Sequence, residues 1–316
     1  MKKTQLKGVL MLLLTAFIWG SSFVAQSVGM ENVQAFTFGG IRTLMGAAAL
    51  LPVILIREIS DLKKLTPAQK AEKKTVSLRS YKHGVILGLA LCVASNFQQW
   101  AFNYTASGKI AFITAFYMLF VPILGLFLKK KVPLFTWLCA ALGCAGLYFL
   151  CIAGKGLNDI NKGDVLSFIC SIFFAVHILV IERFEGGCDA IKLSFTQFLV
   201  SGGITCVLMF IFDSPDINAI NGAIIPLLYS GVMSCGVAYT LQIVGQKYTE
   251  ATLASLLMCM ESVFGVLCGA IVLKEKLTSF EIIGCVVMFA AIVLSQTVPT
   301  KISRKGDRYE HQKTDG

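Results

Sequence analysis

The sequence predicts an all-α integral membrane protein with ten transmembrane helices, arranged as two inverted five-helix repeats with both termini in the cytoplasm. Of its 316 residues, 56% are hydrophobic and only 15% are charged, and the mean hydropathy is +0.73. This balance is too apolar for a soluble domain. Ten apolar stretches follow one another, and the last five resemble the first five. A repeated unit with an odd number of helices must sit in the membrane in opposite orientations.

The expected helices follow from the thickness of the bilayer. A hydrocarbon core of about 30 Å requires about 20 apolar residues per helix. The stretches that meet this requirement are residues 7–27, 35–56, 84–104, 109–128, 133–152, 163–182, 191–212, 222–246, 251–273 and 278–298. Most connections are short, and only residues 57–83 are expected to form a long loop. We therefore assign residues 1–155 to the first repeat, 156–300 to the second and 301–316 to a cytoplasmic tail.

The basic residues are distributed unevenly between the two predicted sides of the membrane. The chain has 28 lysines and arginines and a net charge of +10. The predicted spans place 22 of them on the side of the N-terminus and five on the other side, with Arg42 inside a span. Cytoplasmic loops carry such an excess, so both termini are assigned to the cytoplasm, and nucleic acid is not expected as a partner. The same distribution requires the first span to be a retained helix rather than a cleaved signal.

The cysteines and histidines indicate neither a disulfide framework nor a metal centre. All eleven cysteines except Cys188 fall inside predicted spans, and Cys188 falls in a cytoplasmic loop. Such cysteines are expected to be reduced and to serve as small packing residues. The sequence has no Cys-x-x-Cys pair, and its histidines are scattered at His83, His177 and His311. No metal and no cofactor are therefore predicted.

The internal repeat can be aligned residue by residue. Lys129 to Lys131 after the fourth span align with Lys274 to Lys276 after the ninth, and Gln98 aligns with Gln242. Gly8 aligns with Gly163, and the same offset places Arg42 over Gln197. The loop at 57–83 carries eight basic residues, whereas its counterpart near 213–221 carries two aspartates and no basic residue. Equivalent loops are therefore expected on opposite sides of the membrane.

A series of short motifs runs along the chain. In order, they are Trp19-Gly20-Ser21-Ser22-Phe23, Arg42, Gln98-Gln99, Tyr104 to Lys109, Ala111 to Thr114, Tyr117, Val121-Pro122, Gln242 to Thr249, Glu261, Leu273 to Leu277 and Gly284. In this order they resemble the ten-helix EamA-type branch of the drug/metabolite transporter superfamily. The resemblance implies secondary transport of a small metabolite through a multi-pass protein of the bacterial cell membrane, with the site between the two halves. Ser262 departs from the family pattern, which often has proline there.

Glu261 is the sharpest functional candidate among the polar residues inside the spans. It lies about 15 Å from the start of its span, near the midplane, where a charge costs at least ~2.5–3.5 kcal/mol. Desolvation favours the neutral form of a carboxyl group. Two interpretations are open: Glu261 carries a proton during transport, or it is a structural residue that orients neighbouring helices.

Further candidates lie on other spans, and each also has a structural interpretation. Arg42 can bind a substrate carboxylate through its two-pronged guanidinium group or pair with a helix end. Gln197, its repeat equivalent, and the pair Gln98 and Gln242 lie in opposite halves of the membrane and suggest outer and inner gates. Interhelical hydrogen bonding alone can also explain such residues.

The aromatic candidates lie far from the interfacial belt that membrane proteins favour. Trp19 and Tyr117 can wall a substrate pocket or fill the core with their polar groups hydrogen-bonded. His177 can relay protons or join two helices.

Two function classes remain from the sequence alone. The first is a secondary transporter that works by alternating access, moving an amino acid, a related metabolite or a toxic compound for export. The second is a polytopic membrane enzyme with Glu261 and His177 as acid and base. The expected partners are a small-molecule substrate, the lipid bilayer and, for a coupled transporter, protons. Both a monomer and a homodimer are compatible with the two repeats.

Overall fold

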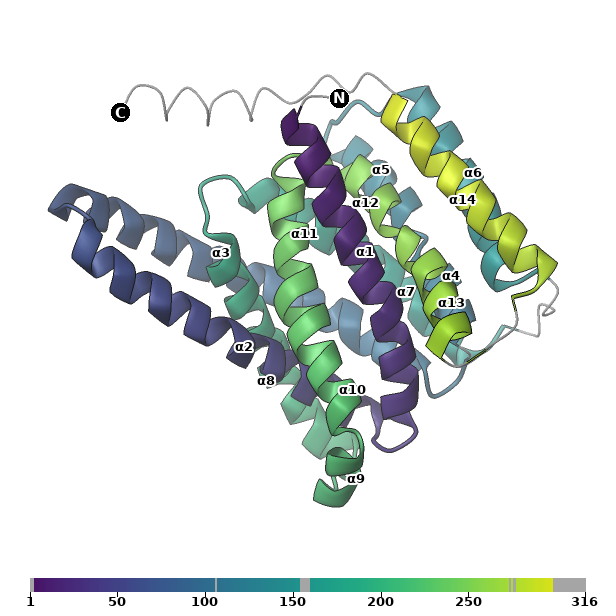
Figure 1. Cartoon of the computed structure of the whole chain (residues 1–316), viewed down its shortest axis with the longest axis horizontal. Coiled ribbons are helices and arrows are strands. Elements are labelled where there is room, and N and C mark those ends of the chain that lie inside the picture. The colour runs from purple at the N-terminus through teal and green to yellow at the C-terminus, as the bar shows by residue number, and fades with distance from the viewer. Residues whose placement is uncertain (1–2, 106, 154–159, 273, 275–276, 298–316) are drawn as a thin grey trace.

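The computed structural model describes residues 3–105, 107–153, 160–272, 274 and 277–297. The predicted tail at 301–316 lies outside these residues. The helices are α1 (Lys3–Met30), α2 (Ala35–Lys64), α3 (Pro67–Ala101), α4 (Ser107–Thr114), α5 (Tyr117–Phe127), α6 (Leu134–Cys151), α7 (Lys162–Phe184), α8 (Ala190–Phe212), α9 (Ile217–Gly222), α10 (Ile224–Leu228), the π-helix η1 (Tyr229–Ala238), α11 (Tyr239–Gln246), α12 (Ala251–Met258), α13 (Met260–Val272) and α14 (Ser279–Thr297). Figure 1 shows them as one bundle.

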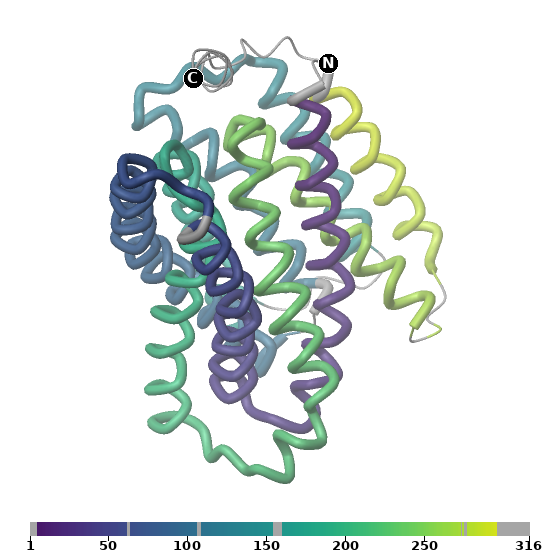
Figure 2. The backbone as a smooth tube through the Cα atoms, turned by 60° about the vertical axis from the view of Figure 1, so that its left-hand side comes forward, coloured from purple at the N-terminus to yellow at the C-terminus, as the bar shows by residue number. Residues whose placement is uncertain are grey.

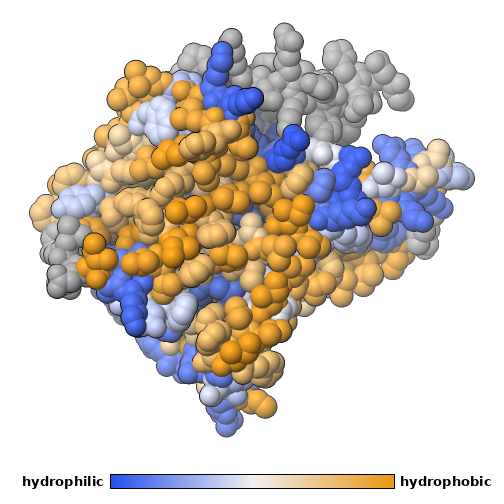
Figure 3. Space-filling model, turned by 180° about the vertical axis from the view of Figure 1, so that it is seen from behind, coloured by the Kyte–Doolittle hydropathy of each residue, from blue (hydrophilic) through white to orange (hydrophobic). Residues whose placement is uncertain are grey.

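The outer surface of the bundle is suited to a bilayer. Nine stretches of the described chain are long and apolar enough to cross a membrane, and Ser279–Ser295 is a shorter apolar helix. Large apolar side chains such as Phe127, Ile225 and Ile271 are largely exposed, and hydrophobic residues cover much of the face in Figure 3. A soluble protein rarely exposes such extensive apolar surface. The chain is therefore a multi-pass membrane protein.

The prediction of a long loop at 57–83 is wrong, because these residues continue the flanking helices. α2 extends to Lys64 and α3 begins at Pro67. Thr66 caps α3: its hydroxyl accepts a hydrogen bond from the backbone N–H of Gln69, and the Gln69 side chain accepts one from the backbone N–H of Thr66. Proline at the first helical position completes this start signal. The two helices form a hairpin that projects from the bundle (Figure 1).

The predicted spans 109–128 and 251–273 are not continuous helices, because each is interrupted near its middle. α4 ends at Thr114 and α5 begins at Tyr117, whereas α12 ends at Met258 and α13 begins at Met260. The alignment of Lys129 with Lys274 places these interruptions at equivalent positions. Pro122 does not explain the first, because it lies inside α5 and the carbonyl group that it leaves without a donor is that of Met118, beyond the break. The second occurs without a proline.

The structure contains pairs of equivalent contacts between the two halves. A Cβ atom on Gly8 would lie 2.5 Å from the Thr249 hydroxyl oxygen, and one on Gly163 would lie 2.8 Å from the methyl carbon of Thr105. These glycines therefore pack directly on the equivalent ends of α11 and α3. Lys129 and its equivalent Lys274 both adopt left-handed backbone conformations, with φ of 59° and 56°. The aligned residues thus occupy equivalent structural positions.

The first helices of the two halves run in opposite directions. The start of α1 packs against Tyr248 and Thr249. Directly before these residues, the Lys247 ammonium group donates a hydrogen bond to the carbonyl oxygen of Cys188, 3.2 Å away. Cys188 follows the end of α7, so the start of α1 and the end of α7 lie at the same end of the bundle. This antiparallel arrangement is the geometry of an inverted repeat, and Figure 2 shows α1 running from the N-terminal end at the top of the molecule toward its lower end.

Gly20 allows α1 to cross α13 in backbone contact. A Cβ atom at Gly20 would lie 2.5 Å from the carbonyl oxygen of Glu261 and 2.7 Å from the backbone nitrogen of Gly265. No side chain fits in this space. The crossing therefore fixes the position of the first turn of α13 relative to α1.

Gly20→Ala is expected to destabilise the protein by about 1–3 kcal/mol, because an added methyl group must push α1 and α13 apart. The measurement is thermal unfolding of the purified protein in detergent. Gly203→Ala is the matched control, since a Cβ atom there meets nothing within 4 Å. Equal unfolding temperatures for the two variants would contradict the close helix crossing.

Candidate functional site

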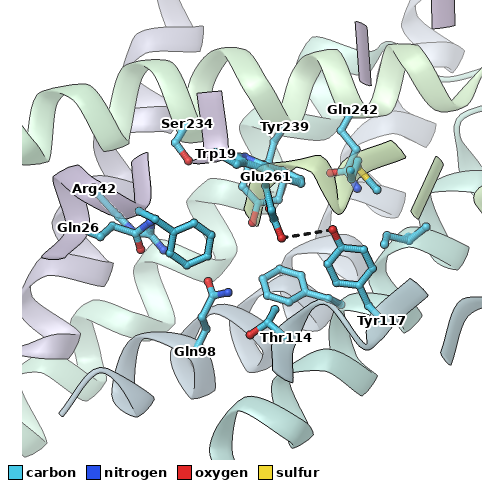
Figure 4. A pocket seen from close by; sticks show the side chains of 14 residues that line it. Trp19, Gln26, Arg42, Gln98, Thr114, Tyr117, Ser234, Tyr239, Gln242 and Glu261 are labelled. Carbon is cyan, nitrogen blue, oxygen red and sulfur yellow. Dashed lines mark hydrogen bonds between the residues drawn. The ribbon is translucent and has the colours of Figure 1, made fainter. Parts of the chain in front are cut away.

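A small cavity lies between the two interrupted helices, and 14 residues line it (Figure 4). Its volume is about 40 Å³, which is room for a few water molecules. The lining residues are Trp19, Phe23, Gln26, Arg42, Gln98, Thr114, Tyr117, Phe174, Ile178, Ser234, Tyr239, Gln242, Met258 and Glu261. Six of the eight candidate residues from the sequence are in this set.

The interruptions of the two spans meet beside the cavity. The Tyr117 hydroxyl donates a hydrogen bond to a carboxylate oxygen of Glu261 at 3.3 Å, drawn as a dashed line in Figure 4. Next to it, the Cys259 thiol lies 3.7 Å from the carbonyl oxygen of Ala115 and donates to it. Each contact joins the first interrupted span to the second. Side chains at the two breaks therefore bond directly to the opposite span.

Glu261 occupies the first turn of α13, because that helix begins only one residue earlier. The free N–H groups at a helix start favour a carboxylate there. The side chain is 4% exposed, and it is the one acidic residue in the cavity lining. The interruption thus places a carboxyl group at the cavity wall in the middle of a span.

Arg42 is the one basic residue in the cavity lining. It is 6% exposed, and its buried Nε atom meets no hydrogen-bond partner in the described chain. Its guanidinium carbon lies 6.0 Å from the centre of the Phe38 ring, near the limit for a cation–π contact. In Figure 4, Arg42 and Gln26 lie toward one end of the cavity, and Tyr117 and Gln242 lie toward the other. The cavity lining therefore has a cationic end, with the carboxyl group of Glu261 further along.

Several other polar atoms of the lining have no hydrogen-bond partner among the residues that the structure describes. They include Nε1 of Trp19 and the side-chain carbonyl oxygens of Gln26 and Gln242, each shielded from solvent. Buried polar groups are nearly always hydrogen-bonded, either to protein or to ordered water. Because these atoms surround a cavity, water or a polar ligand inside it is a suitable partner.

His177 and Gln197 lie outside the cavity and bind each other. The distance from Nε2 of His177 to the side-chain oxygen of Gln197 is 3.0 Å, and both side chains are fully buried. The ring centres of His177 and Tyr239 are 6.0 Å apart in an edge-to-face arrangement. His177 therefore supports a residue of the cavity wall. Glu261 and His177 do not face each other across the cavity, as an acid–base pair would.

Four polar residues of the lining are absent from the candidates selected by sequence: Gln26, Thr114, Ser234 and Tyr239. Helical spacing could have found two of them, because Gln26 is seven residues after Trp19 and Tyr239 is three before Gln242. Ser234 gave no such signal, since it lies in η1, where the π-helix changes the spacing. No group of three potential metal ligands occurs in the described part of the chain.

Comparison with known proteins decides the family. A model of the EamA-like transporter family matches residues 6–152 and again residues 161–297. The chain belongs to the EamA-like transporter family. The two matches cover nearly the whole chain and confirm the membership predicted from the motifs. The EamA two-repeat architecture therefore applies to this transporter-family member.

Relatives of this EamA-like chain are also named as transporters. An uncharacterized transporter from Archaeoglobus fulgidus is 25% identical over 288 residues, covering 90% of this chain and 83% of the relative. The uncharacterized transporter YoaV of Bacillus subtilis is 23% identical, covering 92% and 97%. A solved crystal structure superposes with a TM-score of 0.74 at 16% identity, covering 91% of this chain and 96% of the other. This structural match shows the fold alone.

A double-mutant cycle tests the contact between His177 and Gln197. Each single change, His177→Leu or Gln197→Leu, leaves the other buried polar group without its partner and is expected to cost about 1–3 kcal/mol of stability. The double variant removes both groups and should cost less than the sum of the single changes. Chemical unfolding in detergent measures these free energies. Strictly additive costs would show that the two side chains do not interact.

Proposed function

We propose that this protein is a secondary transporter that binds a small polar metabolite in the central cavity and moves it across the cell membrane by alternating access. The substrate class is an amino acid or a related metabolite, or a toxic compound for export. Family membership supports transport, and the inverted arrangement of α1 and α7 supports two exchangeable orientations of one site. A cavity with room for a few waters must open before a metabolite can enter it.

One observation carries the proposal: two interrupted membrane helices meet at a cavity that contains one carboxyl and one guanidinium group. Irregular backbone at membrane depth is tolerated where it is buried in protein or lines a water-filled cavity. Transporters place substrate and ion sites at such interruptions. The unpaired polar atoms of Trp19, Gln26 and Gln242 add hydrogen-bonding capacity for a ligand.

Glu261 is the proposed coupling group. Its carboxyl group contacts Tyr117 from the opposite interrupted span, so the hydrogen bond responds when these spans separate. Exclusion of water favours the neutral carboxyl group, whereas the start of α13 and contact with water or a cationic substrate favour the ionised form. A change of conformation can therefore load and release one proton at this residue.

Glu261→Gln is expected to reduce the accumulation of substrate driven by a pH gradient by at least about tenfold, because an amide cannot carry the proton. It should retain exchange of substrate between the two sides at equal pH, since glutamine can still accept a hydrogen bond from Tyr117. Purified protein in liposomes receives a metabolite mixture and a pH gradient of either direction. Mass spectrometry of the lumen then identifies what has been moved.

Glu31→Gln is the control, because Glu31 is exposed at the end of α1 and outside the cavity lining. It should transport like the wild type. Undiminished pH-driven accumulation by Glu261→Gln would refute proton coupling through this residue. A compound that is found chemically altered after incubation with the vesicles would instead favour the enzyme alternative.

Arg42 is proposed to bind an anionic group of the substrate. It is a buried cation of the cavity wall, and its Nε atom has no partner in the described chain. A guanidinium group can hold a carboxylate through two parallel hydrogen bonds, which an ammonium group cannot reproduce.

Arg42→Lys is expected to weaken substrate affinity by about 10- to 100-fold, equivalent to the loss of one charge-assisted hydrogen bond. The concentration dependence of exchange at equal pH measures this affinity without involving proton coupling. Arg183→Lys, at an exposed arginine of α7, is the matched control. Equal affinities in the wild type and both variants would exclude anion recognition by Arg42.

A further inference from the structure

The hairpin formed by α2 and α3 carries a second polar groove, remote from the central cavity. The groove has a volume of about 310 Å³ and lies between the hairpin and Lys192 of α8. Its lining residues are Glu58, Asp61, Leu65, Lys70, Lys73, Lys74, Ser77, Tyr81 and Lys192. None of them lines the proposed transport site, and only Lys192 falls inside a predicted span.

Ion pairs hold this groove in shape. The ammonium group of Lys73 lies 2.8 Å from carboxylate oxygens of both Glu58 and Asp61. Lys192, on α8, pairs with Glu58 and donates a hydrogen bond to Ser77. These contacts connect α2, α3 and α8. The two acidic residues of the groove are thereby neutralised by two of its four lysines.

The other two lysines of the groove are available for a ligand. Lys70 and Lys74 are exposed, and neither forms an ion pair within the described residues. They are four residues apart on α3, so they project from the same side of the helix. The wider segment at 57–83 has eight basic residues against three acidic ones. This excess of positive charge attracts anions to the groove.

The flank of the hairpin is hydrophobic, which argues for a ligand at the membrane surface. Ile56 and Ile59 of α2 are 68% and 57% exposed, and Leu78 of α3 is 53% exposed. In Figure 3, the hydrophobic surface of this projection lies along its lower edge, continuous with the surface of the bundle, and the hydrophilic surface lies along the upper edge. An element with these two faces lies in the membrane interface.

We propose that this groove binds the phosphate headgroup of an anionic phospholipid from the adjacent leaflet. Lys70 and Lys74 contact the phosphate, and the acyl chains lie along the apolar flank of the hairpin. Basic residues close to a bilayer bind anionic headgroups in this way. The apolar flank favours a lipid over a free phosphate ion, because a phosphate ion has no acyl chains that could contact it.

The test compares lipid binding by the wild type and by Lys70→Gln/Lys74→Gln. Delipidated protein in detergent is titrated with dioleoylphosphatidylglycerol or dioleoylphosphatidylcholine, and native mass spectrometry counts the bound lipids. The wild type should prefer phosphatidylglycerol. Each lysine near a membrane surface changes lipid affinity by about fivefold, so the double variant should bind phosphatidylglycerol about 25-fold more weakly.

Lys129→Gln/Lys131→Gln removes two exposed lysines between α5 and α6 and should bind like the wild type. A charge-reversed variant, Lys70→Glu/Lys74→Glu, should lose the preference for phosphatidylglycerol altogether.

Equal lipid binding by the wild type and the hairpin variants would overturn the proposal. Displacement of the lipid by millimolar inorganic phosphate would also overturn it, by indicating a free-anion site. A dimer lost in the variants while lipid binding persists would identify the hairpin as a contact between two copies.

Discussion

The bilayer permits a break in a helix only where the exposed backbone groups find partners, and the rest of this structure depends on that constraint. Two spans break at equivalent positions, and side chains at each break bond to the other span. The thiol of Cys259 reaches the carbonyl group of Ala115, and the hydroxyl of Tyr117 reaches Glu261. Neither break would be stable facing lipid. The two breaks therefore pack against each other, and the cavity lies where they meet.

The cavity combines a symmetric frame with asymmetric charges. The offset that aligns Gly8 with Gly163 also aligns Trp19 with Phe174 and Phe23 with Ile178, and all four of these aromatic and aliphatic residues line the cavity. Gln98 and Gln242 form a third equivalent pair. The charged residues have no charged equivalents: Arg42 aligns with Gln197, and Glu261 aligns with Phe116. Equivalent residues of the two repeats thus form the apolar walls, whereas charged residues present in only one repeat make the cavity polar.

Much of this arrangement could be predicted from the sequence because membrane helices obey strong physical rules. Span length, the excess of basic residues and the offset between Lys129 and Lys274 predicted the helices and their repetition. Depth within a span selected Glu261 and Arg42, since a buried charge is costly wherever it lies. His177 was selected by its position inside a span and Gln197 by its alignment with Arg42. Neither criterion revealed that the two side chains bind each other, because the rotation of each helix decides which residues meet.

The helical hairpin at 57–83 and the helix break at Cys259 could not be predicted correctly from the sequence. The charged segment at 57–83 resembles a loop in hydropathy, yet Thr66, Pro67 and Gln69 form a helix start that the composition obscured. The break at Cys259 has no proline to mark it. The equivalent break at Ala115 and Phe116 has no proline either, because Pro122 lies inside α5, so neither break could be located from the sequence.

The packing of α1 and α7 has a consequence for how the molecule is assembled. α1 belongs to the first half of the sequence but packs mainly on η1, α11 and α13 of the second, whereas α7 belongs to the second half and packs on α3, α4 and α5 of the first. Each half therefore donates its leading helix to the other. In the proposed transport mechanism, the units that tilt against each other are therefore built from both halves of the gene product. A five-helix ancestor with this packing would have needed a second copy of itself, inserted upside down, to complete either unit.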